Sequence, residues 1–126
     1  MKTVQIPEGY QQVMPYLIVP DGESFLKFTH QVFEATEKYK LLDDEERIRH
    51  AEVFIGESVI MFGSSTKEYP PNVGGLFIYV DDADKRYQLA LKEGAKSIME
   101  PEDREYGRTC GVIDSNGNTW WITSVL

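Results

Sequence analysis

His50 and Glu52 are two acid–base side chains that stand two positions apart in a run of strand-forming residues. Alternate side chains of a strand point to the same face, so the two should lie side by side. An imidazole beside a carboxylate suits general acid–base catalysis, or half of a divalent-metal site. In that interpretation the surrounding apolar wall raises the pKa of Glu52. Two polar groups satisfied by neighbouring side chains are the favoured interpretation, because two ligands do not make a metal site, and the acid–base interpretation stays open.

The same alternation of side chains along the other predicted strands assigns further residues to the face that holds His50 and Glu52. In each of these strands one face is aliphatic, and the other mixes aromatic, sulfur and polar groups. The second kind of face is typical of a ligand cavity with apolar walls and a few placed polar groups. The predicted ligand-binding residues are Tyr16, His50, Glu52, Met61, Phe77, Tyr79 and Trp121. The aromatic members form either a stacking wall for a ligand or the filling of a closed cavity.

Three other features contain reactive or charged side chains but are less suited to catalysis or metal binding. His30 falls in a predicted helix, away from this face, and is expected at the surface or its boundary. Cys110 has no neighbouring cation that would lower its pKa, so a packed thiol is expected. The acidic run at 43–46 is interpreted as a solvated turn rather than a cation site.

The elements that must position these residues follow from periodicity and turn signals. The first half predicts strands at 13–19, 39–42, 47–55 and 58–62, with a helix at 24–37. Gly56-Glu57 supplies a two-residue hairpin turn, which places Ile55 opposite Ser58 and Glu52 opposite Met61.

The second half repeats the order of the first. It predicts a strand at 75–81, a helix capped by Asp81 or Asp82 and ended by Gly94, a short strand at 96–99, a loop at 100–107 and two final strands. Strand, helix and three strands thus occur twice, which indicates duplication of a unit of about 50–60 residues. We predict a single α+β domain over 1–126, with one module at 13–63, a linker at 64–73 and a second module at 74–125.

Charge and composition exclude several classes of function. The net charge of −8 over 126 residues argues against a nucleic-acid partner and against anionic membrane surfaces. The single cysteine cannot form an internal disulfide and fits a reducing compartment. The first residues contain no apolar signal-peptide core, and no apolar run approaches the ~20 residues of a membrane span. We therefore expect a cytoplasmic protein.

Four segments carry a resemblance to a known family. They are 113–121, which contains an Asp-Ser-Asn-Gly turn, 76–81, which leads into the second helix, 50–61 and 100–107. With them the chain resembles the vicinal oxygen chelate superfamily, which includes glyoxalase I, extradiol dioxygenases, fosfomycin-resistance enzymes and bleomycin-binding proteins. It is most similar to the PhnB-like branch, many of whose members lack an assigned reaction. The resemblance implies two βαβββ modules that form a curved mixed sheet with helices on its convex face.

Enzymes of this family hold a divalent metal with His and Glu side chains from four strands. Transferred one by one, those positions fall on Met14, Met61, Gly75 and Trp121. None of the four offers a ligand for a hard metal. The expectation is therefore no metal and no cofactor, although a displaced metal at His50 and Glu52 stays possible.

The resemblance also implies a function class and an assembly. The first expectation is a metal-free small-molecule binding protein with an unknown ligand. The alternative is a lyase, isomerase or hydrolase that acts through His50 and Glu52, with or without a displaced divalent metal. A protein with a filled cavity that binds a partner is a third possibility. A homodimer is expected, because this architecture often completes its cavities by pairing modules.

The charged loop at 100–107 would lie near the cavity mouth in this family. Arg104, Tyr106 and Arg108 could clamp an anionic ligand there. Four carboxylates in the same stretch neutralise them locally, so a solvated charged loop is favoured.

Overall fold

The order of strands and helices is repeated along the chain. In the computed structural model, which describes residues 1–126, the first module contains β1 (Tyr16–Val19), α1 (Gly22–Phe33), β2 (Thr36–Leu42), β3 (Ile48–Ile55) and β4 (Ser58–Ser64). The second contains β5 (Gly75–Tyr79), α2 (Ala83–Lys92), β6 (Lys96–Arg104), β7 (Gly107–Ile113) and β8 (Thr119–Ser124). The predicted α+β class with two βαβββ modules is confirmed.

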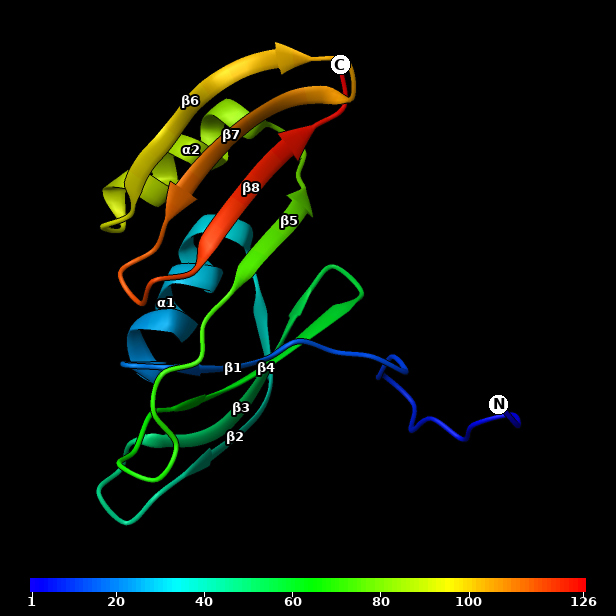
Figure 1. The fold of residues 1–126 in the computed structure, drawn as a ribbon, viewed down its shortest axis with the longest axis vertical. Coiled ribbons are helices and arrows are strands. Elements are labelled where there is room, and N and C mark those ends of the chain that lie inside the picture. Colours follow the sequence, from blue (N-terminus) through cyan, green and yellow to red (C-terminus); the bar gives the residue numbers. More distant parts are fainter.

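The strands form two separate sheets. One has the order β1-β4-β3-β2 and the other β5-β8-β7-β6, each with four strands (Figure 1). The first strand of each module pairs in parallel with the last, and the remaining pairs are antiparallel. No ladder joins β1 to β5, so each module contributes one four-stranded mixed sheet.

The helices lie between and behind these sheets. Helix α1 packs on β3 and β4 and also against α2, whereas α2 packs on β6, β7 and β8 (Figure 1). The aliphatic faces of both sheets therefore join one core, in which Trp120 of β8 lies against Phe25, Phe28 and Phe33. The buried Arg86 reinforces this junction by pairing with Asp81 and with Glu34 of the other module. No helix is both long and apolar enough to cross a membrane.

The ends of α1 differ from the predicted ones. Helix α1 begins at Gly22 because the Asp21 side chain accepts a hydrogen bond from the Ser24 backbone N–H, which makes Asp21 the N-cap. It ends at Phe33 rather than Glu37, because Glu34 adopts a left-handed conformation and donates its N–H to the carbonyl of His30. The N-cap of α2 is Asp82, one of the two predicted residues.

The predicted register of the first hairpin is confirmed. Ile55 pairs with Ser58 and Glu52 pairs with Met61. Gly56 has φ 59°, a left-handed value that glycine adopts without a steric cost and that the two-residue turn requires.

Several predicted strand boundaries are wrong. Strand β2 begins at Thr36 rather than Tyr39, and β5 ends at Tyr79 rather than Asp81. Strand β6 runs to Arg104, so most of the predicted loop at 100–107 is paired with β7. A register irregularity between Met99 and Glu102 accommodates Pro101 on this edge strand. The first strand begins at Tyr16 rather than Val13.

Candidate functional site

A chain of hydrogen-bonded side chains lies on the face of the first sheet that is turned away from the helices, which we call inner face 1. Glu52 of β3 accepts a hydrogen bond from the Tyr10 hydroxyl at 2.5 Å through Oε1. Its Oε2 lies 2.7 Å from Nε2 of His50. Nδ1 of His50 lies 3.0 Å from the hydroxyl oxygen of Tyr16 on β1. His50 and Glu52 therefore do share a face, and both carboxylate oxygens of Glu52 are occupied.

The electrostatics of Glu52 differ from the expectation. Burial raises the pKa of Glu52, but the hydrogen bonds from Tyr10 and His50, with the charges of His50 and Lys38, outweigh burial and hold this pKa below its usual range. The predicted upward shift is wrong, because the apolar wall supplies only the burial contribution and the hydrogen bonds and charges outweigh it. A side chain from outside the regular strands, Tyr10, supplies the decisive donor.

The proton positions along this chain follow from the acceptors. A carboxylate only accepts, so Nε2 of His50 carries the proton that Glu52 receives. In neutral His50 this leaves Nδ1 free to accept the proton of the Tyr16 hydroxyl. Burial, followed by the Glu52 charge, raises the pKa of Tyr16, so the phenol stays protonated. Glu52 orients His50, and Tyr16 is the solvent-exposed end of this series of hydrogen bonds.

The second sheet presents an aromatic inner face of its own, which we call inner face 2. Phe77, Tyr79 and Trp121 are 51%, 62% and 38% exposed. Phe77 and Tyr79 contact edge to face, with ring centroids 5.1 Å apart. The Trp121 ring covers Gly111 on the neighbouring strand so closely that an added Cβ there would lie 2.6 Å from the indole. The Trp121 ring therefore lies over β7 at Gly111, with part of its surface open to solvent.

The predicted ligand-binding residues thus fall into two groups within one chain. Tyr16, His50, Glu52 and Met61 belong to the first sheet, whereas Phe77, Tyr79 and Trp121 belong to the second. The modules meet mainly through the helices and their shared core, and no hydrogen-bonded strand pair joins them. Tyr16 stacks with His50, at a centroid distance of 5.5 Å, rather than with the other aromatic residues of the predicted wall.

The four positions that correspond to the family's metal ligands are divided in the same way. Met61 pairs with Tyr16 and Glu52 in the first sheet, and Met14 lies two residues before β1. Gly75 and Trp121 belong to β5 and β8. No three His, Cys, Asp or Glu side chains converge anywhere in the chain in a way that could hold a metal ion.

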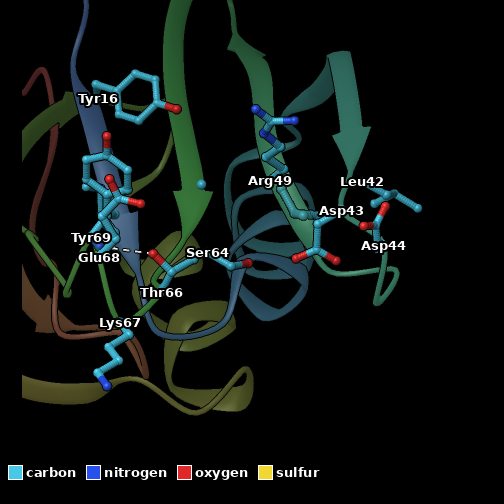
Figure 2. Close-up of a pocket in the computed structure, with 13 residues that line it drawn as sticks. Tyr16, Leu42, Asp43, Asp44, Arg49, Ser64, Thr66, Lys67, Glu68 and Tyr69 are labelled. Carbon is cyan, nitrogen blue, oxygen red and sulfur yellow. Dashed lines mark hydrogen bonds between the residues drawn. The ribbon is translucent and has the colours of Figure 1, made fainter.

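A cavity of about 830 Å³ opens at the end of the first sheet, between the β2–β3 turn and the segment that follows β4 (Figure 2). Its lining is formed by Tyr16, Ile18, Leu42, Asp43, Asp44, Ile48, Arg49, Gly63, Ser64, Thr66, Lys67, Glu68 and Tyr69. Tyr16 connects this cavity to the His50–Glu52 pair. Two polar residues were not predicted from the sequence: Arg49, which lines this cavity although strict alternation assigns it to the helix side, and Tyr10, which bonds Glu52 and precedes any periodic pattern.

The remaining charged and reactive candidates are paired with neighbouring groups or buried. Arg104 pairs with Glu102, and Arg108 pairs with Asp84 and Asp103. Cys110 is buried, and burial raises its pKa to about 11. The Nδ1 of His30 lies 2.9 Å from the carbonyl oxygen of Ala35, next to the end of α1.

The acidic run also has a structural role. Asp43 accepts hydrogen bonds from the backbone N–H groups of Glu45 and Arg47, which closes the β2–β3 turn.

Comparison with known proteins assigns the family. Residues 9–122 match the model of the glyoxalase/bleomycin resistance protein/dioxygenase superfamily. This match spans most of the chain, and the chain belongs to that superfamily.

Individual relatives are more distant. The chain is 27% identical over 118 residues to an uncharacterised protein of Mycobacterium bovis, covering 84% of this chain and 78% of that one. Its fold is similar to that of TnmS3, an antibiotic binding protein from Streptomyces sp. CB03234, with a TM-score of 0.71, 16% identity and coverage of 100% of this chain and 99% of that one. It is also similar to the PhnB protein from Bacillus cereus, with a TM-score of 0.75, 15% identity and coverage of 91% and 100%. At these identities the two structures establish the fold alone.

Proposed function

We propose that this member of the superfamily is a small-molecule binding protein that lacks the family's metal site. The observation that carries the proposal is the pair of inner faces, which the helices leave uncovered and which combine aromatic side chains with a few oriented polar groups. Such a surface suits planar or largely apolar ligands with one polar group directed at Tyr16 and His50. The similar fold of an antibiotic binding protein from Streptomyces is consistent with a small-molecule ligand.

The residues at the four inherited metal positions support the absence of the family chemistry. Methionine is a soft thioether, and glycine and tryptophan offer no side-chain acceptor for a hard divalent ion. His50 and Glu52 supply two donors at most, and they are bonded to each other. The donor set therefore does not fit the family's four-ligand site.

We also propose that the protein is a cytoplasmic homodimer. Each chain presents two half-sites on separate sheets, so one copy's inner face 2 could close over its partner's inner face 1. That arrangement would bury the exposed Phe77, Tyr79 and Trp121 and would bring all the predicted ligand-binding residues to one cavity. The single buried Cys110 fits a reducing compartment.

A compound screen read by tryptophan fluorescence tests the binding proposal. Trp121 is partly exposed, and stacking of a planar ligand on it should contribute about 1–2 kcal/mol and quench its emission. Trp121→Ala should lose most of the quenching and weaken binding. Trp120→Phe is the matched control, because Trp120 is buried and bonded to Asp114, so it should keep the quenching. Equal binding of every hit by wild type and Trp121→Ala would contradict the assigned face.

The hydrogen-bonded chain favours one alternative, a lyase, isomerase or hydrolase that acts through His50 and Glu52. Glu52 would orient His50, and His50 would exchange a proton with a substrate through Tyr16 or directly. Incubating each bound compound with the protein and analysing it by mass spectrometry tests this alternative. Turnover that His50→Gln and Glu52→Gln abolish would favour the enzyme, whereas recovery of unchanged compounds would favour the binding protein.

A further inference from the structure

Arg49 occupies a β-bulge between β2 and β3. Leu41 pairs with His50, and the next residue, Leu42, pairs with Ile48, so Arg49 is the extra residue on β3. Ile48 is thereby turned into the core with no exposed surface. Arg49, which strict alternation would direct at the helices, instead lines the cavity at the end of the sheet.

Gly63 on the neighbouring strand makes room for this bulge. A Cβ added at Gly63 would lie 2.5 Å from the backbone oxygen of Arg49 and 3.7 Å from the Tyr16 hydroxyl. Contact with a backbone atom cannot be relieved by rotating a side chain. A larger residue at 63 would therefore displace the bulge and narrow the cavity beside Tyr16.

The guanidinium of Arg49 has no partner in the protein. It forms no hydrogen bond or ion pair, whereas Arg86, Arg104 and Arg108 each bind carboxylates. Asp43, in the same cavity, directs its carboxylate at backbone N–H groups. Figure 2 shows the Arg49 guanidinium directed away from that carboxylate. An unpaired guanidinium at the wall of a cavity is suited to bidentate recognition of an oxyanion.

The rest of the lining limits which anion fits. Tyr16, Ile18 and Leu42 supply apolar contact, and Lys67 adds one positive charge. Asp44 and Glu68 oppose a second negative charge on the ligand. Asp43 adds a third carboxylate, so three acidic side chains face the two cations Arg49 and Lys67. The cavity therefore suits one carboxylate-type oxyanion, held directly by Arg49, on a largely apolar molecule rather than a polyanion.

We propose that this cavity is the subsite for a single oxyanion of the bound small molecule, and that the bulged Arg49 is its anchor. The inference rests on the proposed binding function and adds the charge class of the ligand. Tyr16 lies at the boundary between this subsite and the His50–Glu52 pair, so a ligand anchored at Arg49 would extend over inner face 1.

Three isosteric probes test the proposal: benzoate, benzamide and benzamidine, which carry a negative, no and a positive charge. Each is titrated into the ¹⁵N-labelled full-length protein and followed by two-dimensional NMR. Benzoate should bind about tenfold more tightly than benzamide, because its hydrogen bonds to arginine are charge-assisted, and benzamidine should bind most weakly. The shifted resonances should include the amides of Arg49 and Gly63.

The variant Arg49→Gln should bind benzoate and benzamide equally, while its spectrum stays that of a folded protein. The matched control is Arg104→Gln, which removes an exposed arginine of the second module already paired with Glu102, and it should keep the tenfold preference. Equal binding of the three probes by wild type, binding by none of them, or an unchanged preference in Arg49→Gln would overturn the proposal. If the proposal fails but neutral ligands still quench Trp121, the proposed binding function stands. The fluorescence test addresses Trp121, whereas the NMR test addresses Arg49.

Discussion

At the scale of single residues, the sequence placed His50 and Glu52 correctly on one face of a strand. Strand alternation is a short-range geometric rule, so it survives in the structure. Their partners were not predictable in the same way. Tyr10 reaches Glu52 from a segment without secondary structure, and the pKa of Glu52 is lowered because of that contact and the one from His50. Local patterns reveal which face a side chain occupies, but not the distant donors that set its charge.

The lowered pKa of Glu52 predicts a pH-dependent contribution to stability. A carboxylate whose pKa is depressed on folding stabilises the native state above its unfolded pKa of about 4.3, and this stabilisation is lost as the pH falls through the lower folded value. In urea unfolding, Glu52→Gln should be less stable than wild type at pH 7, and the difference should narrow below about pH 4.3. Glu57→Gln, in the exposed β3–β4 turn, should match wild type at both pH values. A constant difference across the range would contradict the assigned hydrogen bonds.

At the scale of elements, turn chemistry was the most informative signal. The Gly56-Glu57 turn predicted the β3–β4 register because a two-residue loop allows only one pairing. The length of β6 and the bulge at Arg49 were missed. An extra residue in a ladder is decided by packing on both sides, here by Ile48 entering the core and by Gly63 leaving space, and neither requirement is visible in a single strand.

The turn between β7 and β8 should depend strongly on Asp114. Its buried carboxylate accepts hydrogen bonds from the backbone N–H groups of Asn116 and Asn118, and from the indole N–H of Trp120. Replacing Asp114 with Ala leaves these donors unsatisfied and should lower the free energy of unfolding by about 3 kcal/mol in denaturant titrations. Asp103→Ala, which removes an exposed carboxylate paired with Arg108, should cost far less. Similar losses for the two variants would refute the structural role assigned to this turn.

At the scale of the whole molecule, the repeated element order was sufficient to predict two βαβββ modules. How the modules sit together was not predictable, because it depends on Trp120 packing among phenylalanines of α1 and on the Arg86 bridge between modules. The consequence for function is direct. The predicted ligand-binding residues lie on two separate sheets rather than around one closed cavity, so under the proposed binding function each sheet would supply one half-site.

This division predicts a dimer. Size-exclusion chromatography with light scattering at micromolar concentration should give twice the 14.4 kDa chain mass. Replacing Phe77 and Tyr79 together with Asp places charge on inner face 2 and should shift the protein toward monomer. The same double replacement at the exposed Val4 and Ile6, which belong to neither sheet, should not. A wild-type mass near that of one chain would contradict the dimer. The ligand would then have to bind to one inner face without a second face to cover it.

The central claim is that the inner faces bind a ligand without a divalent metal. The affinity of a fluorescence-detected ligand under three conditions tests this claim most directly. The dissociation constant is measured with excess EDTA, with added Mn²⁺ and with added Zn²⁺, on protein whose metal content is known from elemental analysis. We predict the same constant in all three, and less than stoichiometric metal after dialysis, because Met14, Met61, Gly75 and Trp121 offer no hard-metal ligand set. Binding that EDTA abolishes and either ion restores, with about one ion per chain, would contradict the account.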